Sequence, residues 1–391
     1  MMRVAPNADQ AQFRDLIRRV IADLDAAPIG NSGGRDAALS RRQAFAGVGL
    51  FGLTVPESEG GFASEREDLA IASFELGRAP RLTPRLEQVV LASHLILSSA
   101  SPSRQALIDG LVSGTAVPAV ALWEEPNAFA LSDIITSARR DADGYRLCGR
   151  KICVLGGSEC DLLLVSAWLD QGAAPRLALF AVPARVAGLS VRAYDLIDLS
   201  AAADITLDDV QLPPSSLLNP DVGEALSDAI DEAMITLCAG LVGSMERSIE
   251  LTIAHLKLRE QFGRPLAQFQ ALQHQVADSY IAADNARSSV YAALAARNAD
   301  PAAARRVVAG CKVKVTLAAR AAIGQALHLH GGIGFTSEYP IGHHYLRAIV
   351  DEKLLGDSEY HLARHMTLAR GDCPTVARAE PAGADSEVLL P

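Results

Sequence analysis

Four long stretches of helical periodicity fill the C-terminal half of the chain and limit the folds that it can adopt. They come after the breaks at Pro213-Pro214 and Asn219-Pro220, and they cover residues 223–258, 267–297, 301–330 and 340–369. Helices of this length that follow one another closely predict a four-helix bundle, because each can bury its apolar face against its neighbours.

In the preceding half of the chain the sequence pattern changes near residue 116. Before it, helical stripes such as Phe13, Leu16 and Ile17 alternate with Gly, Pro and Ser; after it come short apolar runs separated by turns. We therefore expect a mainly α-helical protein with a central β domain. The expected parts are an N-terminal helical domain over 1–115, the β domain over 116–221, the bundle over 222–370 and a flexible tail over 371–391.

The charge balance and the lack of targeting signals narrow the class of protein. Acidic residues outnumber basic ones 46 to 36, so the net charge of −10 disfavours binding to nucleic acid or to an anionic membrane. The N-terminus lacks the pattern of a signal peptide, and no uncharged apolar run is long enough to span a membrane. We expect a cytoplasmic protein with no membrane contact.

The cysteines and histidines do not predict a metal site. The six cysteines include no CxxC pair and have no histidines at ligand spacing, so we expect reduced thiols. Six histidines gather late in the chain, without carboxylates or cysteines in a ligand pattern, and we assign them to solvated helix faces. They are His328, His330, His343, His344, His361 and His365.

Residues 259–270 combine groups that suit a dinucleotide. A helix is expected to end at Phe262-Gly263, with Arg259 projecting from that end. A guanidinium there can pair with a pyrophosphate, Phe262 can cover an adenine, and the amide of Gln270 can bond ring nitrogens or a ribose. The alternative is a helix junction in which Arg259 only interacts with the C-terminal end of the helix dipole.

A glycine-rich turn follows the third of the long helical stretches. Gly331, Gly332 and Gly334 come directly after His330, a few residues beyond His328. Glycines at this place form a helix C-cap and turn, or they let backbone amides approach a ligand closely. The turn alone does not decide between the two.

In their order and spacing these segments resemble the acyl-CoA dehydrogenase family, and the likeness covers nearly the whole chain. Residues 50–57 with Gly60-Gly61 resemble its N-terminal turn, and residues 138–151 resemble its β-hairpin. The resemblance implies a β-barrel-like central domain, a four-helix bundle and FAD extended between subunits. It also implies an oxidoreductase of lipid degradation that removes an α-proton and a β-hydride from an acyl-CoA. The residues that it assigns to FAD binding are Arg259, Phe262, Gln270, His328, Gly331, Gly332 and Gly334.

The base that such a reaction needs is missing from its usual positions. The resemblance places it at Leu355, before Gly356, or in a minority of the family at Ala233. Neither side chain can accept a proton. Glu232 is one candidate, although a shift of one residue turns a helical side chain by about 100° and a solvated helix face is the alternative. Asp357 is another, and it could instead cap the following helix.

The positions that the resemblance places around the flavin ring have also changed. Where the family commonly carries a Trp against the ring and a Thr or Ser bonded to N5, this chain has Cys153 and Leu155. Where the family has Thr-Glu-Pro at the pyrimidine edge, the chain has Glu124-Glu125-Pro126. The charge of Glu124 would oppose a reduced flavin unless it is neutralised.

A chain that keeps the FAD-phosphate motifs but lacks the base and the flavin-ring residues resembles the small, non-catalytic subunit of bacterial heteromeric acyl-CoA dehydrogenases. The resemblance is to the pimeloyl-CoA or steroid side-chain type. We expect a heterotetramer in which the chain contributes half of an inter-subunit FAD site and a homologous partner supplies the base. One alternative is a self-sufficient homotetramer that uses Glu232 or Asp357 as the base. The other is a structural or regulatory member of the family without catalysis.

Overall fold

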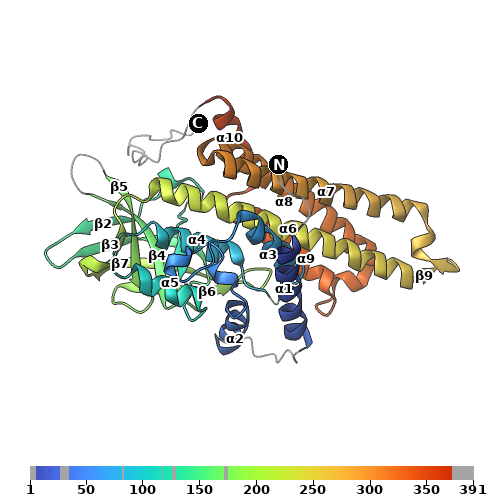
Figure 1. Ribbon diagram of the computed structural model, residues 1–391, viewed down its shortest axis with the longest axis horizontal. Coiled ribbons are helices and arrows are strands. Elements are labelled where there is room, and N and C mark those ends of the chain that lie inside the picture. Colours follow the sequence, from blue (N-terminus) through green and yellow to red (C-terminus); the bar gives the residue numbers. More distant parts are fainter. Residues whose placement is uncertain are drawn as a thin grey trace, which may run out of the picture.

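The structure, a computed structural model, describes residues 6–26, 35–81, 83–116, 118–125, 129–170 and 175–371. Pro126, Cys373 and the predicted tail beyond Gly371 lie outside these residues. The described chain is mainly helical with a central β sheet, which confirms the predicted fold class. The sheet lies toward one end of the long axis and the long helices extend to the other (Figure 1).

The N-terminal helices pack on one another and on the first bundle helix. They are α1 (Ala8–Ala26), α2 (Arg35–Ala46), α3 (Arg66–Gly77), α4 (Leu86–Leu97) and α5 (Arg104–Val112). Short 3-10 helices at Leu50–Gly52 and Glu57–Glu59 connect α2 to α3. One hydrophobic core runs from these helices into the bundle, through residues such as Phe51, Leu91 and Met234.

The central sheet holds eight strands in the order β6-β7-β3-β2-β4-β5-β8, and β1 pairs with β4. Their bounds are β1 (Ala119–Ala121), β2 (Ser137–Arg140), β3 (Tyr145–Leu155), β4 (Leu162–Leu169), β5 (Arg176–Pro183), β6 (Leu189–Asp195), β7 (Ala201–Leu212) and β8 (Leu217–Asn219). Among the described residues no ladder joins β6 to β8, so the expected barrel is an open sheet here. A register shift in β3 between Lys151 and Val154 will matter for the site.

The C-terminal half contains α6 (Gly223–Leu258), α7 (Gln270–Ala299), α8 (Pro301–His330), α9 (Pro340–Lys353) and α10 (Ser358–Ala369). The 3-10 helix Gly331–Phe335 joins α8 to α9. The short strands β9 (Glu260–Gln261) and β10 (Arg264–Pro265) form a hairpin between α6 and α7, followed by a 3-10 turn at Leu266–Gln268. None of the helices within the described residues is long and apolar enough to cross a membrane.

Two predicted boundaries in this half are wrong. The first long helix ends at Leu258, as the periodicity over 223–258 predicts and not at Phe262, because Arg259 has an extended backbone (φ −77°, ψ 123°) that leads into the hairpin. The helix expected over 340–369 is two helices, because Leu355 and Gly356 have φ angles of 58° and 103°. A right-handed helix cannot continue through such angles.

Close packing of α3 on α6 depends on small residues. A methyl group at Gly77 would overlap the carbonyl oxygen of Gly240, and one at Gly243 would overlap the carbonyl oxygen of Phe74. The two helices therefore touch backbone to backbone at the centre of the molecule. This contact fixes the N-terminal helices against the bundle.

Candidate cofactor site

The two segments assigned to dinucleotide binding lie at the same end of the bundle. His255, one turn before Arg259 on α6, contacts His330 with ring centroids 4.6 Å apart, and both rings contact Tyr339. Arg259 caps the C-terminal end of α6, and its carbonyl accepts a hydrogen bond from Leu266 N at 2.8 Å. The fold thus brings the end of α6 next to the glycine turn, as a two-part site requires.

The side chains of the first segment face solvent. Arg259 and Gln270 are exposed, and Arg259 has no ion pair within the described part of the chain. Phe262 is 90% exposed and packs edge-to-face with Phe269, while Arg264 lies over the Phe269 ring at 4.0 Å. A ring this exposed is free to stack on a ligand.

The glycine turn is open toward the same side. Side-chain atoms added at Gly331 or Gly332 would meet nothing within 4 Å, whereas Gly334 is packed against Leu327. Gly331 has a φ of 61°, so its own backbone requires glycine, but packing within this chain does not require one at Gly332. The open space leaves both backbones accessible to a ligand. His328 is also exposed, in the last turn of α8.

The positions expected around a flavin ring lie elsewhere. The β9 hairpin is at one end of the long axis, and the sheet that carries Cys153 and Leu155 is at the other (Figure 1). The chain therefore keeps the two halves of the expected cofactor site far apart. An extended dinucleotide held by one copy could not use both.

Glu124 does not face an open flavin site. Its carboxylate is 2.6 Å from Lys151 Nζ and accepts hydrogen bonds from Ile135 N, Thr136 N and Thr136 Oγ1. Lys151 also donates to Leu122 O and Ser166 Oγ, and both members of the pair are buried. Burial lowers the pKa of Lys151 to about 8, against the opposing effect of Glu124. The charge that seemed to oppose a reduced flavin is thus neutralised inside the sheet.

Cys153 and Leu155 end β3 in an irregular stretch. Cys153 has a φ of 50°, inside the register shift of β3, and its N–H donates to Asp204 Oδ1 at 3.3 Å. Burial raises the pKa of the Cys153 thiol, so it is not an activated nucleophile. Leu155 is buried and has no polar atom in its side chain. Neither residue offers a flavin a ring face or an N5 partner.

Aromatic side chains close the cleft between the sheet and the bundle. The Phe129 ring contacts Trp123 at 6.2 Å and Tyr360 at 5.7 Å between centroids. The cavity beside them, which Leu355 also lines, has a volume of about 120 Å³. Pockets that enclose drug-sized ligands have volumes of about 300–1,000 Å³. A three-ring flavin with its substrate does not fit this cleft.

The turn at the usual base position is kept rigid by a histidine. Leu355 is buried with a positive φ, and its carbonyl accepts a hydrogen bond from His361 Nε2 at 2.8 Å. Burial lowers the pKa of His361 to about 3, so the ring is neutral at ordinary pH. This turn therefore places an aliphatic side chain where the resemblance implies a carboxylate.

Glu232 is held in an ion cluster and not on a solvated face. Its side chain is 4% exposed, and Oε1 lies 2.8 Å from Arg66 Nε and 3.0 Å from Arg297 Nε. It lines a cavity with Arg66, His94 and Asn298, on a different side of α6 from the cleft of Leu355. The assignment to a solvated face is wrong, and the geometry favours a structural role over a base.

Asp357 is the N-cap of α10, as the capping alternative predicted. Its Oδ1 accepts a hydrogen bond from Tyr360 N at 3.0 Å, and Oδ2 lies 3.1 Å from Lys353 Nζ. The Tyr360 hydrogen bond lowers the pKa of Asp357, which keeps it ionised. Ala233 is fully buried in the core. No carboxylate thus lines the cleft at either base position.

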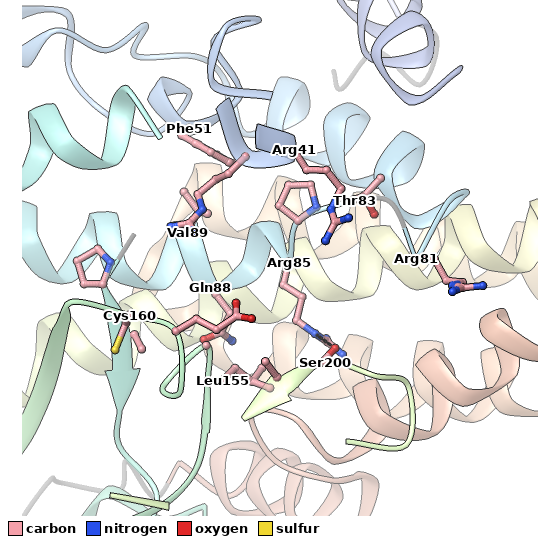
Figure 2. Close-up of a pocket in the computed structure, with 17 residues that line it drawn as sticks. Arg41, Phe51, Arg81, Thr83, Arg85, Gln88, Val89, Leu155, Cys160 and Ser200 are labelled. Atoms are coloured by element: carbon pink, nitrogen blue, oxygen red, sulfur yellow. Dashed lines mark hydrogen bonds between the residues drawn. The ribbon is translucent and has the colours of Figure 1, made fainter. Parts of the chain in front are cut away.

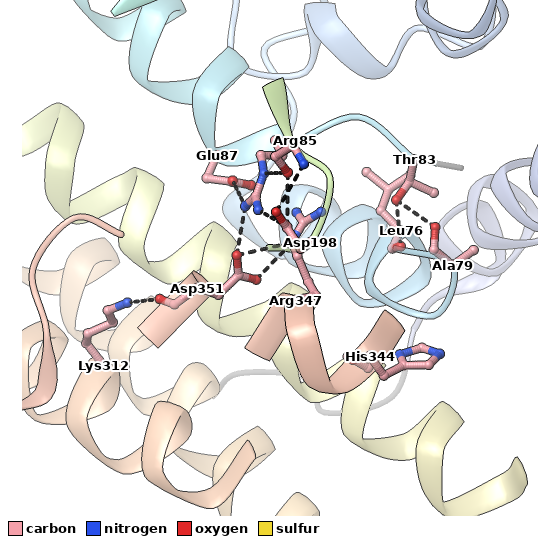
Figure 3. Close-up of polar contacts among 12 residues, drawn as sticks. Leu76, Ala79, Thr83, Arg85, Glu87, Asp198, Lys312, His344, Arg347 and Asp351 are labelled. Carbon is pink, nitrogen blue, oxygen red and sulfur yellow. Dashed lines mark hydrogen bonds and ion pairs between the residues drawn. The ribbon is translucent and has the colours of Figure 1, made fainter. Parts of the chain in front are cut away.

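A buried ion network fills the space behind the cleft (Figure 3). Arg85 binds Asp198 at 2.5 Å, Asp351 at 2.7 Å and Glu87 at 3.1 Å, and Arg347 binds Asp351 at 3.1 Å. The remaining cavity between α3, α4, α6 and α9 measures about 30 Å³. That volume holds about two waters and no acyl chain.

Several of these residues were not found from the sequence. Lys151 was visible in the hairpin motif, but Phe129, Tyr360 and Arg85 gave no signal because their partners are distant in sequence. The histidine assignment was wrong for His330, His344 and His361, which are buried. Within the described residues, no group of three or more His, Cys, Asp or Glu is arranged to hold a metal.

FAD therefore fits one part of the chain and not the other. The cleft between the sheet and the bundle does not accommodate a flavin ring, since it is small and is closed by aromatic side chains. The end of the bundle presents a free guanidinium, an exposed aromatic ring and open glycine amides. Those groups suit the phosphates and adenine of a dinucleotide.

Comparisons with known proteins agree with this architecture. Residues 224–367 match the family model "Acyl-CoA dehydrogenase, C-terminal domain". The acyl-CoA dehydrogenase IpdE2 of Mycobacterium tuberculosis is 30% identical over 88% of this chain and 92% of its own length. A variant of the "Tcur3481-Tcur3483 steroid ACAD" superposes with a TM-score of 0.81 at 29% identity, over 93% of this chain and 98% of that one.

A more distant structure shows the same fold. Glutaryl-CoA dehydrogenase from Mycobacterium smegmatis, solved with FADH2, superposes with a TM-score of 0.83 at 22% identity, over 94% of this chain and 95% of that one. The family model, the identity to IpdE2 and the shared fold lead to one conclusion: the chain belongs to the acyl-CoA dehydrogenase family of oxidoreductases.

Proposed function

We propose that this chain is the non-catalytic subunit of a heteromeric, FAD-dependent acyl-CoA dehydrogenase. The end of its bundle completes the FAD site of a homologous partner, and that partner supplies the flavin-ring pocket and the base. The complex, and not this chain alone, oxidises the acyl-CoA. FAD, when bound, supplies the hydride acceptor; Arg259 and the glycine turn hold its phosphates and adenine.

The observation that carries the proposal is the contrast between the two ends of the molecule. At one end Arg259 and Phe262 are exposed, and a side chain added at Gly332 would meet open space. Packing among the described residues does not require a glycine at position 332. At the other end the cleft is about 120 Å³ and has leucine at the base position. A chain that held its own flavin would need the second end open.

Exposed apolar residues around Arg259 support a partner at this end. Leu258 is 83% exposed, Phe262 90%, Phe335 75% and Ile333 46%. Exposed apolar residues on both segments at this end of the bundle are what an interface with a partner would cover. Arg259, at the C-terminal end of α6, lies among them.

The comparisons support the heteromeric arrangement in one respect. The name of the "Tcur3481-Tcur3483 steroid ACAD" joins two components, and at 29% identity this chain is similar to it over nearly its full length. A two-component enzyme is therefore a precedent among its relatives.

Coexpression with the sibling subunit tests the proposal. The chain purified alone should hold little FAD, and the complex should hold FAD and oxidise an acyl-CoA. Arg259→Gln in this chain should weaken FAD binding by the complex about ten-fold, because it removes a charge-assisted contact to phosphate. Arg14→Gln, at a partly exposed arginine of α1 that pairs with Asp15, is the matched control and should change nothing.

The rival functions give different results. If the chain alone is saturated with FAD and oxidises an acyl-CoA, it is a self-sufficient homo-oligomer and the proposal is wrong. If the complex is active but Arg259→Gln leaves FAD affinity unchanged, the end of the bundle does not hold the cofactor. If no preparation contains flavin, the chain is a structural or regulatory member of the family.

A further inference from the structure

A second cavity lies between the N-terminal helices and the sheet, apart from the exposed end of the bundle. Its volume is about 260 Å³, and it is bounded by α2, the start of α4, and the ends of β1, β3 and β7. Figure 2 shows Arg41, Thr83 and Arg85 on one side and Leu155 and Cys160 on the other. Nothing in the proposed FAD-completing role uses this space.

The walls of this cavity carry uncompensated positive charge. Four arginines line it, Arg41, Arg42, Arg81 and Arg85, against one carboxylate, Glu159. Arg85 is neutralised by Glu87, Asp198 and Asp351. In contrast, neither Arg41 nor Arg42 makes an ion pair or a side-chain hydrogen bond with any residue that the structure describes.

Half-buried arginines without partners are costly unless something compensates them. Arg41 and Arg42 are both only partly exposed, and they come from consecutive positions of α2. Burying a cation without a counter-charge costs free energy, and a bound anion would recover it. The carboxamide of Gln88, which likewise has no side-chain hydrogen bond among the described residues, adds a neutral donor on the same lining.

The rest of the lining is apolar. Phe51, Val89, Leu155 and the prolines Pro84 and Pro118 form it together with two alanines. An inorganic anion would leave this surface in contact with water. A molecule with one anionic group and a compact apolar body would satisfy both kinds of wall.

We propose that this cavity binds a small organic anion, with a carboxylate held by Arg41 and Arg42 and an apolar body against Phe51, Val89 and Leu155. The proposal rests on the proposed function in one respect, namely that no flavin ring occupies the neighbourhood of Leu155. The cavity opens between the N-terminal helices and the sheet, so it could be filled while a partner covers the end of the bundle.

Calorimetry with hexanoate as the probe tests the proposal on the full chain. Hexanoate should bind, whereas 1-hexanol and inorganic phosphate should bind at least about ten-fold more weakly, since each lacks one of the two features that the walls recognise. Arg41→Gln and Arg42→Gln should each weaken hexanoate binding by about ten-fold. Arg139→Gln, at an exposed arginine of β2, is the control and should leave the affinity unchanged.

Alkylation of cysteines locates the bound probe in the unaltered protein. Cys160 is half-buried on the cavity wall and Cys148 is exposed. Burial raises the pKa of Cys160 to about 11, so the labelling is done at alkaline pH and followed by mass spectrometry. Hexanoate should slow the labelling of Cys160 and not that of Cys148.

The contrary results are distinct from those for the FAD site. Equal binding of phosphate or 1-hexanol, unchanged affinity in both arginine variants, or equal labelling of Cys160 with and without hexanoate would each overturn the proposal. Competition between hexanoate and flavin mononucleotide for the isolated chain would overturn it too, and would in addition count against the proposed function. Loss of FAD binding by the Arg259→Gln complex says nothing about this cavity.

Discussion

Disruption of the Glu124–Lys151 pair gives a quantitative test of how the chain closes its own flavin site. Both side chains are essentially buried, and the distance from Lys151 Nζ to Glu124 Oε1 is 2.6 Å. Lys151→Met removes the only positive charge bonded to the carboxylate among the described residues and leaves three donors, Ile135 N, Thr136 N and Thr136 Oγ1. Removing one partner of a buried ion pair costs about 3–5 kcal/mol of folding stability. Because three donors still bond the carboxylate, we expect Lys151→Met to cost about 3 kcal/mol.

The double variant Glu124→Gln/Lys151→Met should recover much of that loss. With both charges removed, no ion is left buried alone, so we expect a total cost of about 1–2 kcal/mol. The coupling energy of the cycle should therefore be at least about 2 kcal/mol. Arg139→Met, at an exposed arginine of the neighbouring strand β2, is the matched control and should cost less than about 1 kcal/mol.

Urea unfolding followed by tryptophan fluorescence measures these differences. Both tryptophans report on this region: Trp168 is buried in β4 and bonds Ile134 O at 2.7 Å, and Trp123 adjoins Glu124. Single-variant costs below about 1 kcal/mol that simply add in the double variant would refute the reasoning. They would mean that Glu124 is solvated and available to the cleft.

Three further outcomes follow from single contacts. Burial lowers the pKa values of His344 and His361 from the ordinary 6.5 to about 3, so between these pH values the unfolded state binds more protons than the folded state. The folding stability should therefore be complete above pH 6.5 and fall as the pH drops toward 3. In thermal melts at graded pH, His361→Gln should make this decline less steep. Asp357→Ala should cost about 1 kcal/mol through the lost cap of α10, measured by urea unfolding, and leave the activity of the complex unchanged. Glu232→Gln should lower the free energy of unfolding by about 3 kcal/mol, because it removes the negative charge between Arg66 and Arg297. It should leave the pH profile of the activity of the complex unchanged, whereas replacing a catalytic base would shift that profile.

Local sequence signals predicted the elements of the fold well. The helices α6 and α8 have the expected bounds, since their periodicity is long and uninterrupted. The break at Leu355 was missed, because it depends on a non-glycine residue with a positive φ angle. Propensity gives no warning of such residues.

The candidate site was predicted in part for the same reason. Arg259 and the glycine turn were recognised because they form short continuous motifs, and the His255–His330 contact brings the two segments together. The closing of the cleft by Phe129 and Tyr360 joins residues far apart in the chain, which no local pattern reveals.

Charged residues were the least predictable part of the site. Glu232 and Glu124 looked like free carboxylates in the sequence, yet each is paired with a distant basic side chain in the core. Such pairing depends on tertiary contacts, so only the structure shows which basic side chain each buried carboxylate faces.

The flavin content and subunit composition of the native protein test the central claim most directly. A tagged copy of the chain is purified from its source, and the flavin absorbance is compared with the amount of each polypeptide present. The account predicts a homologous second subunit and fewer FAD molecules than chains, with FAD bound about ten-fold more weakly when Arg259 of this chain is replaced by Gln. A preparation that contains this chain alone, with one FAD bound to every copy, would contradict it.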